Sequence, residues 1–426
     1  MHGSNPSTER DGLSGIGWST FAHRFGRYYA DHEMWIPPRL RTREWMFMPF
    51  GGGTPVRHRA FNRPESLRAF IRDRVPHSCF YSTAYYDEPS QTKMADKRWR
   101  GADLIFDLDG DHLPGVTDRD FPAMMDVIQH QAWSLWNDFL EPEFGFDPRH
   151  LQVTFSGHRG FHLHVRDPEL LHLDSDARRE LVSHIRGEAV DVDVLMPRID
   201  GPRTTGWAPR LRSGLTSVLS ALDRIDAGDA KELKLRIDAL DDLRERDQAR
   251  SRGSREGVRQ LAALLQDERR RERIMQGHLS SLPIKRMDHR YYQNLLMDLV
   301  RADRSVVLGN AGETDEVVTI DVRRVIRWPT SLHGKSGLRV TEFPLERLDP
   351  DGGNPFDALD EAVVFGRDRI HRIRGLVNDA RARIGDHEIE LSTGEEHDVS
   401  EAMSMFLALK GWAKPLGSTS AHDGER

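Results

Sequence analysis

The spacing of apolar residues along the first 175 positions predicts a sheet built from short strands. In 151–155 and 161–165 apolar and polar residues alternate, and in 104–109 the two aspartates alternate with Phe106 and Leu108, which is the period of a strand with one buried face. Aromatic clusters bounded by turn residues extend this pattern toward the N-terminus. The predicted strands are Trp45–Phe50, Cys79–Tyr86, Leu104–Asp109, Leu151–Phe155 and Phe161–Val165.

Helical spacing occurs once among these strands and dominates after residue 175. Residues 121–140 are apolar on one side, as expected of a helix that covers a sheet. Apolar residues recur at helical spacing through 177–189 and 214–222, and then through the highly charged region 229–276. We interpret residues 176–285 as a helical insertion packed against the sheet domain.

The chain is expected to return to the sheet domain through a helix at 287–301. A further helix should begin at Thr319, whose hydroxyl can cap it, and stop at Pro329. A strand is predicted at 338–343. The expected organisation is a disordered N-terminus at 1–14, a discontinuous sheet domain at 15–175 and 286–350, the insertion at 176–285, and C-terminal helices with a flexible tail at 351–426.

Composition limits the location and the partners. No run approaches about eighteen apolar residues, and the polar N-terminus lacks the regions of a signal peptide, so we expect a cytoplasmic protein without membrane contact. The net charge of -7 does not indicate a polyanionic partner, although Lys and Arg exceed Asp and Glu in the first 100 residues. The single cysteine, Cys79, excludes an internal disulfide and a multi-cysteine zinc site.

Two carboxylates in the predicted strand 104–109 give the first chemical signal. Because side chains alternate along a strand, the apolar residues would enter the core while Asp107 and Asp109 share the opposite face. Two like charges at about 4 Å cost on the order of 1 to 4 kcal/mol, and divalent cations remove that cost. Surface carboxylates would give the same alternation, but the charge concentrated at the strand's end favours a metal site.

The turn that joins the next two strands concentrates hydrogen-bond donors. It reads Ser-Gly-His-Arg-Gly-Phe-His from Ser156 to His162, and its glycines permit positive φ and close approach of a ligand. Ser156, His158 and Arg159 would point donors outward, and the planar fork of arginine suits a triphosphate. For His162 alone a structural role is the ordinary interpretation, but beside Ser156 and Arg159 it is a candidate phosphate donor.

A third region gathers basic residues around the expected helix end at Pro329. In a helix, Arg323 and Arg327 would lie one turn apart and form a basic stripe. Arg327, His333 and Lys335 then cluster around the turn that follows.

The same region offers a third carboxylate. Asp315 could be a further metal ligand, and Asp321 competes for that role. Spacing does not choose between them.

Together these three blocks resemble the small catalytic subunit of archaeo-eukaryotic DNA primases. That family carries an Asp-x-Asp motif on a strand, a Ser-Gly-x-Arg-Gly-x-His motif, and a third Asp before a helix that leads into a Ser-Leu-His-Gly-Lys stretch. The corresponding segments here begin at Asp107, Ser156, Asp315 and Ser331. The resemblance covers residues 20–175 and 285–345.

The resemblance implies an α+β fold with a mixed or antiparallel sheet as catalytic core and a helical inserted subdomain. It also implies template-directed synthesis of short RNA primers, with DNA as an alternative product, on single-stranded DNA. The implied partners are a primase large subunit, which would complete a heterodimer, the DNA template, and NTPs or dNTPs.

The resemblance also assigns roles to residues. Asp107, Asp109 and Asp315 would bind two Mg²⁺ or Mn²⁺ ions, and the motif order prefers Asp315 to Asp321. Many family members hold a zinc knuckle between the first two motifs, which Cys79 alone cannot build, so no zinc is expected. The implied nucleotide-binding residues are Ser156, His158, Arg159, His162, Arg327, His333, Lys335 and Arg57.

Two other functions fit parts of the pattern. Phe106–Gly110 matches the core of the Asp-x-Asp-Gly-Thr motif of haloacid dehalogenase-type phosphatases, with Asp107 as the nucleophile, although Asp111 replaces the threonine. An inert subunit could use the same fold to bind nucleic acid, against which the intact carboxylates argue. Nucleotide incorporation on single-stranded DNA would support the primase function, whereas phosphate release from small phosphomonoesters without incorporation would support the phosphatase.

Overall fold

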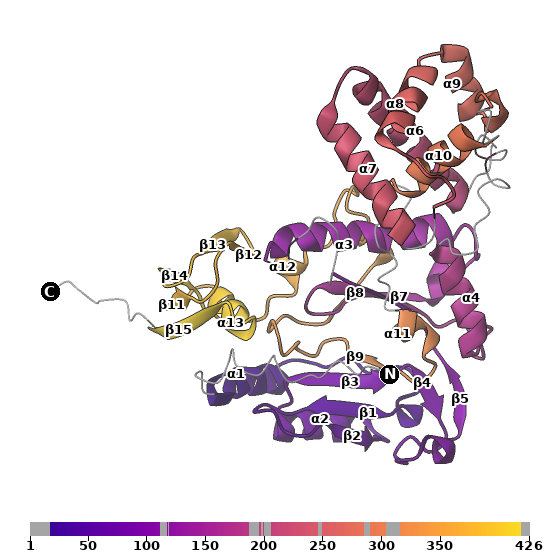
Figure 1. The fold of residues 1–426 in the computed structure, drawn as a ribbon. Coiled ribbons are helices and arrows are strands. Elements are labelled where there is room, and N and C mark those ends of the chain that lie inside the picture. Colours follow the sequence, from indigo (N-terminus) through magenta and orange to yellow (C-terminus); the bar gives the residue numbers. More distant parts are fainter. Residues whose placement is uncertain are drawn as a thin grey trace. The chain divides into compact units, whose positions relative to one another are not determined.

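The computed structural model describes residues 18–110, 117, 119–186, 196, 199, 206–245, 249–284, 290–303 and 316–418 (Figure 1). The chain divides into two compact units. Unit 1 comprises Met1–Trp133, Asp147–Arg179 and Glu313–Arg426, and unit 2 comprises Ser134–Phe146 and Glu180–Gly312. Both units are therefore discontinuous in sequence.

Unit 1 is built on two four-stranded antiparallel sheets. The first sheet has the order β2-β1-β3-β9 and the second has the order β10-β7-β8-β6. The predicted α+β fold is confirmed, with antiparallel pairing in both sheets. Their strands are β1 (Trp45–Met48), β2 (Val56–Arg59), β3 (Ser78–Ser82), β9 (Val325–Arg327), β6 (Leu104–Asp109), β7 (Leu151–Phe155), β8 (Gly160–Val165) and β10 (Thr341–Phe343).

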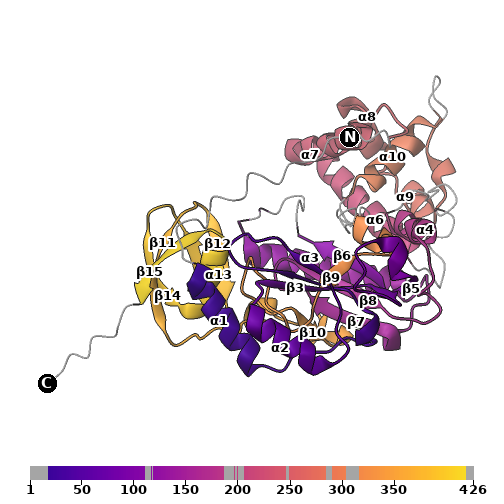
Figure 2. The same cartoon turned by 90° about the horizontal axis from the view of Figure 1, so that it is seen from below.

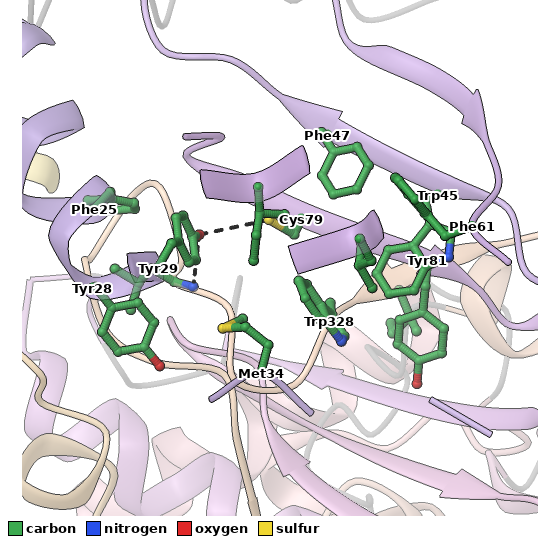
Figure 3. Packing of buried hydrophobic residues seen from close by; sticks show 14 of the residues in the cluster. Phe25, Tyr28, Tyr29, Met34, Trp45, Phe47, Phe61, Cys79, Tyr81 and Trp328 are labelled. Atoms are coloured by element: carbon green, nitrogen blue, oxygen red, sulfur yellow. Dashed lines mark hydrogen bonds between the residues drawn. The ribbon is translucent and has the colours of Figure 1, made fainter. Parts of the chain in front are cut away.

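An aromatic core packs on the first sheet and reaches the second. Trp45, Tyr81 and Trp328 belong to this cluster, and the Trp45 and Trp328 rings meet edge to face at 5.0 Å (Figure 3). Ile105 of β6 belongs to the same cluster. Because Ile105 shares a strand face with Asp107 and Asp109, that face of the second sheet points toward the first sheet.

Helices and short elements complete the two sheets. The helix predicted at 121–140 is present as α3 (Phe121–Leu135), followed by the π-helical turn η3 (Trp136–Leu140), which belongs to unit 2. The other elements of this part are α1 (Trp18–Asp31), η1 (Leu40–Thr42), α2 (Pro64–Arg74), η2 (Met94–Lys97), the antiparallel pair β4 (Ala84–Tyr86) and β5 (Trp99–Ala102), η4 (Pro148–His150) and η8 (Leu345–Arg347).

The helix predicted from Thr319 to Pro329 is wrong. A short helix, α11 (Glu316–Ile320), ends just after Thr319, and the chain then forms β9. Arg327 pairs with Phe80 across β3 and β9. The β-branched Val325 and Ile326 fit a strand, and pairing with β3 satisfies their backbone groups. The basic residues before Pro329 therefore do not form a helical stripe.

The prediction of helices for residues 351–426 is wrong in the part that the structure describes, which ends at residue 418, and the predicted tail lies outside the described residues. The C-terminal part forms a three-stranded sheet, β14-β11-β15, and a hairpin, β12-β13 (yellow in Figures 1 and 2). Each residue of α13 is buried, so this helix forms the core of the C-terminal subdomain. Its elements are α12 (Ala358–Glu361), β11 (Ile370–Gly375), β12 (Ala380–Ile384), β13 (His387–Leu391), β14 (Glu396–Ser400), α13 (Glu401–Leu409) and β15 (Ala413–Ser418).

Unit 2 is helical in its described residues. In α6 the buried Leu211, Leu215, Val218 and Leu222 recur every three or four residues, which gives the apolar stripe of a packed helix. The helix α10 also belongs to unit 2, although the sequence placed the return to the sheet domain at 286. The helices are α4 (Ser175–Ile185), which continues from unit 1, α6 (Trp207–Asp226), α7 (Ala230–Glu245), α8 (Arg255–Leu264), α9 (Glu268–Met275), η6 (Leu279–Ser281) and α10 (Tyr291–Arg301).

Crossing a bilayer requires a helix of about 20 predominantly apolar residues. Among the helices in the described ranges, none is at once long enough and apolar enough to do so.

Candidate functional site

Two carboxylates lie at the end of β6 on the face that points toward the first sheet. The Asp107 side chain is 19% exposed and that of Asp109 is 46% exposed. Their nearest cross-strand partners on β8 are His162 and Gly160. The alternation of the strand thus places both carboxylates on one face, as the sequence predicted.

His162 lies beside the first of these carboxylates. Its Nε2 is 3.3 Å from Oδ1 of Asp107. Burial, with a smaller contribution from Arg327, lowers the pKa of His162 to about 3, so the imidazole is neutral near pH 7. A neutral ring can still donate one N–H, and Nε2 is the nitrogen that faces the carboxylate.

Arg159 lies beside the second carboxylate. Its Nε donates to Oδ1 of Asp109 at 3.0 Å, and the backbone N–H of Gly110 donates to the carbonyl of Arg159 at 2.8 Å. A Cβ on Gly160 would come within 2.3 Å of the Leu108 carbonyl. Only glycine therefore lets the turn approach β6 this closely.

Arg327 brings a second guanidinium from the first sheet. Burial lowers its pKa to about 10, while Asp107 and Asp109 act in the opposite direction, so the group is charged near pH 7. Its Cζ lies 4.8 Å from the Phe80 ring centre, and its Nη1 is buried without a hydrogen-bond partner among the described residues. This unsatisfied donor is suited to an anionic ligand.

The turn from Ser156 to Gly160, which we call the second-motif turn, lies against the segment that follows Pro329. The rings of His158 and His333 stack at 4.8 Å, and Ser336 Oγ donates to the Gly157 carbonyl at 2.5 Å. The backbone N–H of Lys335 donates to Nδ1 of His333 at 3.0 Å, which leaves the proton of this ring on Nε2. Burial holds the pKa of both histidines well below the usual value, so both rings are neutral.

Of the remaining predicted nucleotide-binding residues, Ser156 lies in the second-motif turn and Arg57 lies at the far edge of the first sheet. Ser156 is buried, and its Oγ accepts a hydrogen bond from the His158 N–H at 3.4 Å. Arg57 lies on β2, where its Nη2 is 4.0 Å from Glu44 Oε1. Since β2 and β9 are the two outer strands of the first sheet, the structure does not bring Arg57 together with Arg327.

The third carboxylate was predicted at Asp315, which lies outside the described residues. The helix α11 begins at the next residue and packs against β6. Asp321 follows α11, accepts the Arg323 N–H at 2.9 Å, and acts electrostatically on Tyr86. Within the part of the chain that the structure describes, no three His, Cys, Asp or Glu side chains form a metal-binding group, so Asp321 does not complete a triad with the β6 pair.

Sequence reasoning missed two charged residues that hold parts of this region in place, Asp103 before β6 and Lys410 beside His158. Asp103, just before β6, accepts hydrogen bonds from Arg43 at 2.9 Å and Arg166 at 3.3 Å and is fully buried. Lys410, just after α13, has its Nζ 3.1 Å from Nε2 of His158. No local motif marks Lys410, because it lies 252 residues from its partner.

Comparison with known proteins identifies the family of this chain. The family model described as DNA primase small subunit matches residues 106–345. The DNA primase small subunit PriS of Methanothrix thermoacetophila is 33% identical over 410 residues, covering 92% of this chain and 97% of the relative.

Two haloarchaeal relatives match as extensively. PriS of Haloarcula marismortui is 34% identical and that of Natronomonas pharaonis is 35% identical, each over 92% of this chain and over 96% and 97% of the relative. This chain belongs to the DNA primase small subunit family. The matched family segment contains the β6 carboxylates, the second-motif turn and Arg327 through Lys335, but it ends before Lys410.

Proposed function

We propose that this chain is the catalytic subunit of a DNA primase and that it synthesises short primers on single-stranded DNA by nucleotidyl transfer. One observation carries the proposal. Asp107 and Asp109 share one face of β6, and Arg159 and Arg327 reach that face from two other strands or turns. Carboxylates next to cations suit a reaction that joins a metal-bound polyphosphate to a hydroxyl group.

We propose Mg²⁺ or Mn²⁺ as the metal. Both β6 carboxylates offer oxygen ligands, which these hard cations prefer, and Asp315 is proposed as the third ligand because α11 begins beside it and packs on β6. Two divalent ions bound there would stabilise charge on the transferring phosphoryl group and favour ionisation of the attacking 3′-hydroxyl. The negative charge of the carboxylates repels an anion, so their position also limits the directions from which a polyphosphate can approach.

The nucleotide would be held by donors that surround this pair. Arg159 and Arg327 supply planar forks that bond two phosphate oxygens at once. The neutral rings of His162 and His333 can each donate one N–H without adding charge. Ser156, His158 and Lys335 are proposed to complete the triphosphate site. Arg57 stays a proposed nucleotide-binding residue, although it lies on β2, at the opposite edge of the first sheet from Arg327.

The relatives are named small subunits, and we propose that this chain likewise acts in a heterodimer with a primase large subunit. Contacts with the template would be mostly to phosphates, as suits an enzyme that is indifferent to sequence. The proposed products are RNA primers from NTPs, with DNA from dNTPs as the alternative.

The family match favours primer synthesis over the phosphatase alternative. In addition, the phosphatase motif accounts for neither the second-motif turn nor Arg327. An inert subunit would not require two carboxylates and two guanidinium groups on one face.

The experiment is primer synthesis on single-stranded DNA by the chain with its large subunit. Asp109→Ala should abolish incorporation, whereas Asp73→Asn, which changes a carboxylate 77% exposed on α2, should not alter it. Unchanged synthesis by Asp109→Ala would contradict the catalytic assignment. Phosphate release from small phosphomonoesters without incorporation would support the phosphatase instead.

A further inference from the structure

Lys410 is held in a cage of rings where the C-terminal subdomain meets the second-motif turn. Its Nζ lies 4.7 Å from the ring centre of Phe121 and 4.7 Å from that of Trp412. The same Nζ is 3.1 Å from Nε2 of His158. Two cation–π contacts and one hydrogen bond therefore fix the ammonium in place.

This contact determines which nitrogen of His158 carries the proton. A lysine ammonium can only donate hydrogen bonds, so Nε2 of His158 accepts and the proton of the neutral ring lies on Nδ1. The ring then stacks on His333, whose own proton lies on Nε2 because Nδ1 accepts the Lys335 N–H. The two stacked rings thus have opposite and defined tautomers.

The charges around His158 all favour its neutral form. The groups that face it are the cations of Lys410, Arg159, Arg327 and Lys335. A protonated His158 would add a charge to this group, and burial adds to the cost. Among these cations, Lys410 has the largest electrostatic effect on the ring and donates a hydrogen bond to it.

The backbone of the turn also packs closely on His333. Gly157 has a φ of 84°, and a Cβ there would come within 2.9 Å of the His333 Cβ. The backbone of the turn thus lies against the same histidine on which the His158 ring stacks. Arg159, which belongs to the same turn, donates to Asp109 and so links the turn to the β6 carboxylates.

We propose that Lys410 is a positioning residue of the nucleotide site: it fixes the Nδ1–H tautomer of His158 against His333 and so holds the Ser156–Gly160 turn ready for a triphosphate. The part that concerns the triphosphate rests on the proposed function. The C-terminal subdomain, which lies outside the matched family segment, would thus contribute directly to substrate binding.

The test compares Lys410→Met with Lys410→Arg and with Lys414→Met in the full chain. Methionine keeps the apolar stem but removes the donor, arginine keeps a charge and a donor, and Lys414 is an exposed lysine on β15. The first readout is ¹⁵N NMR of the histidine rings at pH 7, assigned with a His158→Gln variant. The second is the dissociation constant for ATP with Mg²⁺, and the third is the thermal unfolding midpoint, which checks folding.

We expect Lys410→Met to remove the Nδ1–H signature of His158 and to weaken ATP binding about tenfold, the effect of losing one charge-assisted hydrogen bond. Lys410→Arg should restore most of the binding, and Lys414→Met should match the wild type. A folded Lys410→Met variant with unchanged His158 signals and ATP affinity would overturn the inference. So would a folded Lys410→Arg variant as impaired as Lys410→Met. If the wild type binds no nucleotide, the proposed function fails, while the NMR comparison still tests the role of Lys410.

Discussion

His162 lies directly opposite Asp107 in the β6–β8 ladder, with 3.3 Å between its Nε2 and Oδ1 of the carboxylate. The neutral ring orients this carboxylate without neutralising it. Asp107→Asn removes one negative charge, so we expect Mn²⁺ affinity to fall at least about tenfold. The free energy of unfolding should change little, because relief of the repulsion from Asp109 offsets the lost attraction to the buried Arg327. Titration with Mn²⁺ monitored by electron paramagnetic resonance measures the Mn²⁺ affinity, and Asp73→Asn is the control.

Arg327 should affect the metal and the nucleotide in opposite directions. Its charge acts on both β6 carboxylates, so Arg327→Met should tighten Mn²⁺ binding by about 1 kcal/mol while weakening ATP binding. Arg323→Met removes an exposed charge from the same segment and should change neither. Isothermal titration of each ligand separates the two effects. Weaker binding of both ligands by a folded Arg327→Met variant would refute this arrangement of charges.

Gly157 should be far less tolerant of alanine than a glycine with nearly the same φ and open surroundings. Gly157 has a φ of 84°, and a Cβ added there would lie 2.9 Å from the His333 Cβ, whereas Gly394 has a φ of 86° with open space around it. Gly394→Ala should cost about 1 kcal/mol from the left-handed backbone alone. Gly157→Ala should cost roughly 2 kcal/mol more. Urea unfolding of both variants tests this, and equal losses would contradict it.

The buried pair Arg43–Asp103 should stabilise the start of β6 far more than an exposed pair does. Both side chains are fully buried, and Asp103 also accepts from Arg166. Asp103→Asn should cost about 3 to 5 kcal/mol, because it leaves buried cations without a counter-charge. Asp398→Asn breaks a pair with Arg372 that is about half exposed and should cost far less, because solvent screens the two charges. The free energies of unfolding compare the two directly.

Buried histidines should make the fold sensitive to acid. Burial lowers the pKa of His162 to about 3 and holds the pKa of His158, His164 and His333 well below the usual value. Below about pH 6.5 these histidines bind protons in the unfolded chain but not in the folded chain. The free energy of unfolding therefore has its full value above that pH and decreases as the pH drops. Each such histidine adds about 1.4 kcal/mol per pH unit to the slope.

Urea unfolding between about pH 7.5 and 5 measures that slope. Replacing His162 with Gln should reduce the slope, because one buried neutral histidine is then removed. Stability that stayed constant across this range would show that these rings are not buried in the neutral form.

The sequence predicted the parts of this structure that depend on local pattern. β6 has the predicted bounds, Leu104–Asp109, because Phe106 and Leu108 alternate with the two terminal carboxylates, which sets the face that each side chain occupies. The turn from Ser156 to Gly160 also lies between the expected strands.

The errors arise where tertiary contacts decide. The arginine spacing from 323 to 327 favours a helix, but the free edge of β3 is completed by β9. In β11, only Ile373 and Gly375 are buried, so its charged sequence gives no clear strand signal. Lys410 has no motif around it, and its distance from His158 along the chain hides their contact. The third metal ligand, predicted at Asp315, stays a prediction.

The outer strands β9 and β10 have a consequence for how the protein is made. Both belong to the segment 325–343, yet they complete sheets whose other strands emerge from the ribosome before residue 166. Until that late segment is translated, β3 and β7 each present an open edge that another nascent chain could pair with. Synthesis that stalls within the helical unit would therefore leave an aggregation-prone product without Arg327, so the face that combines Arg327 with the β6 carboxylates is among the last features of this polypeptide to mature.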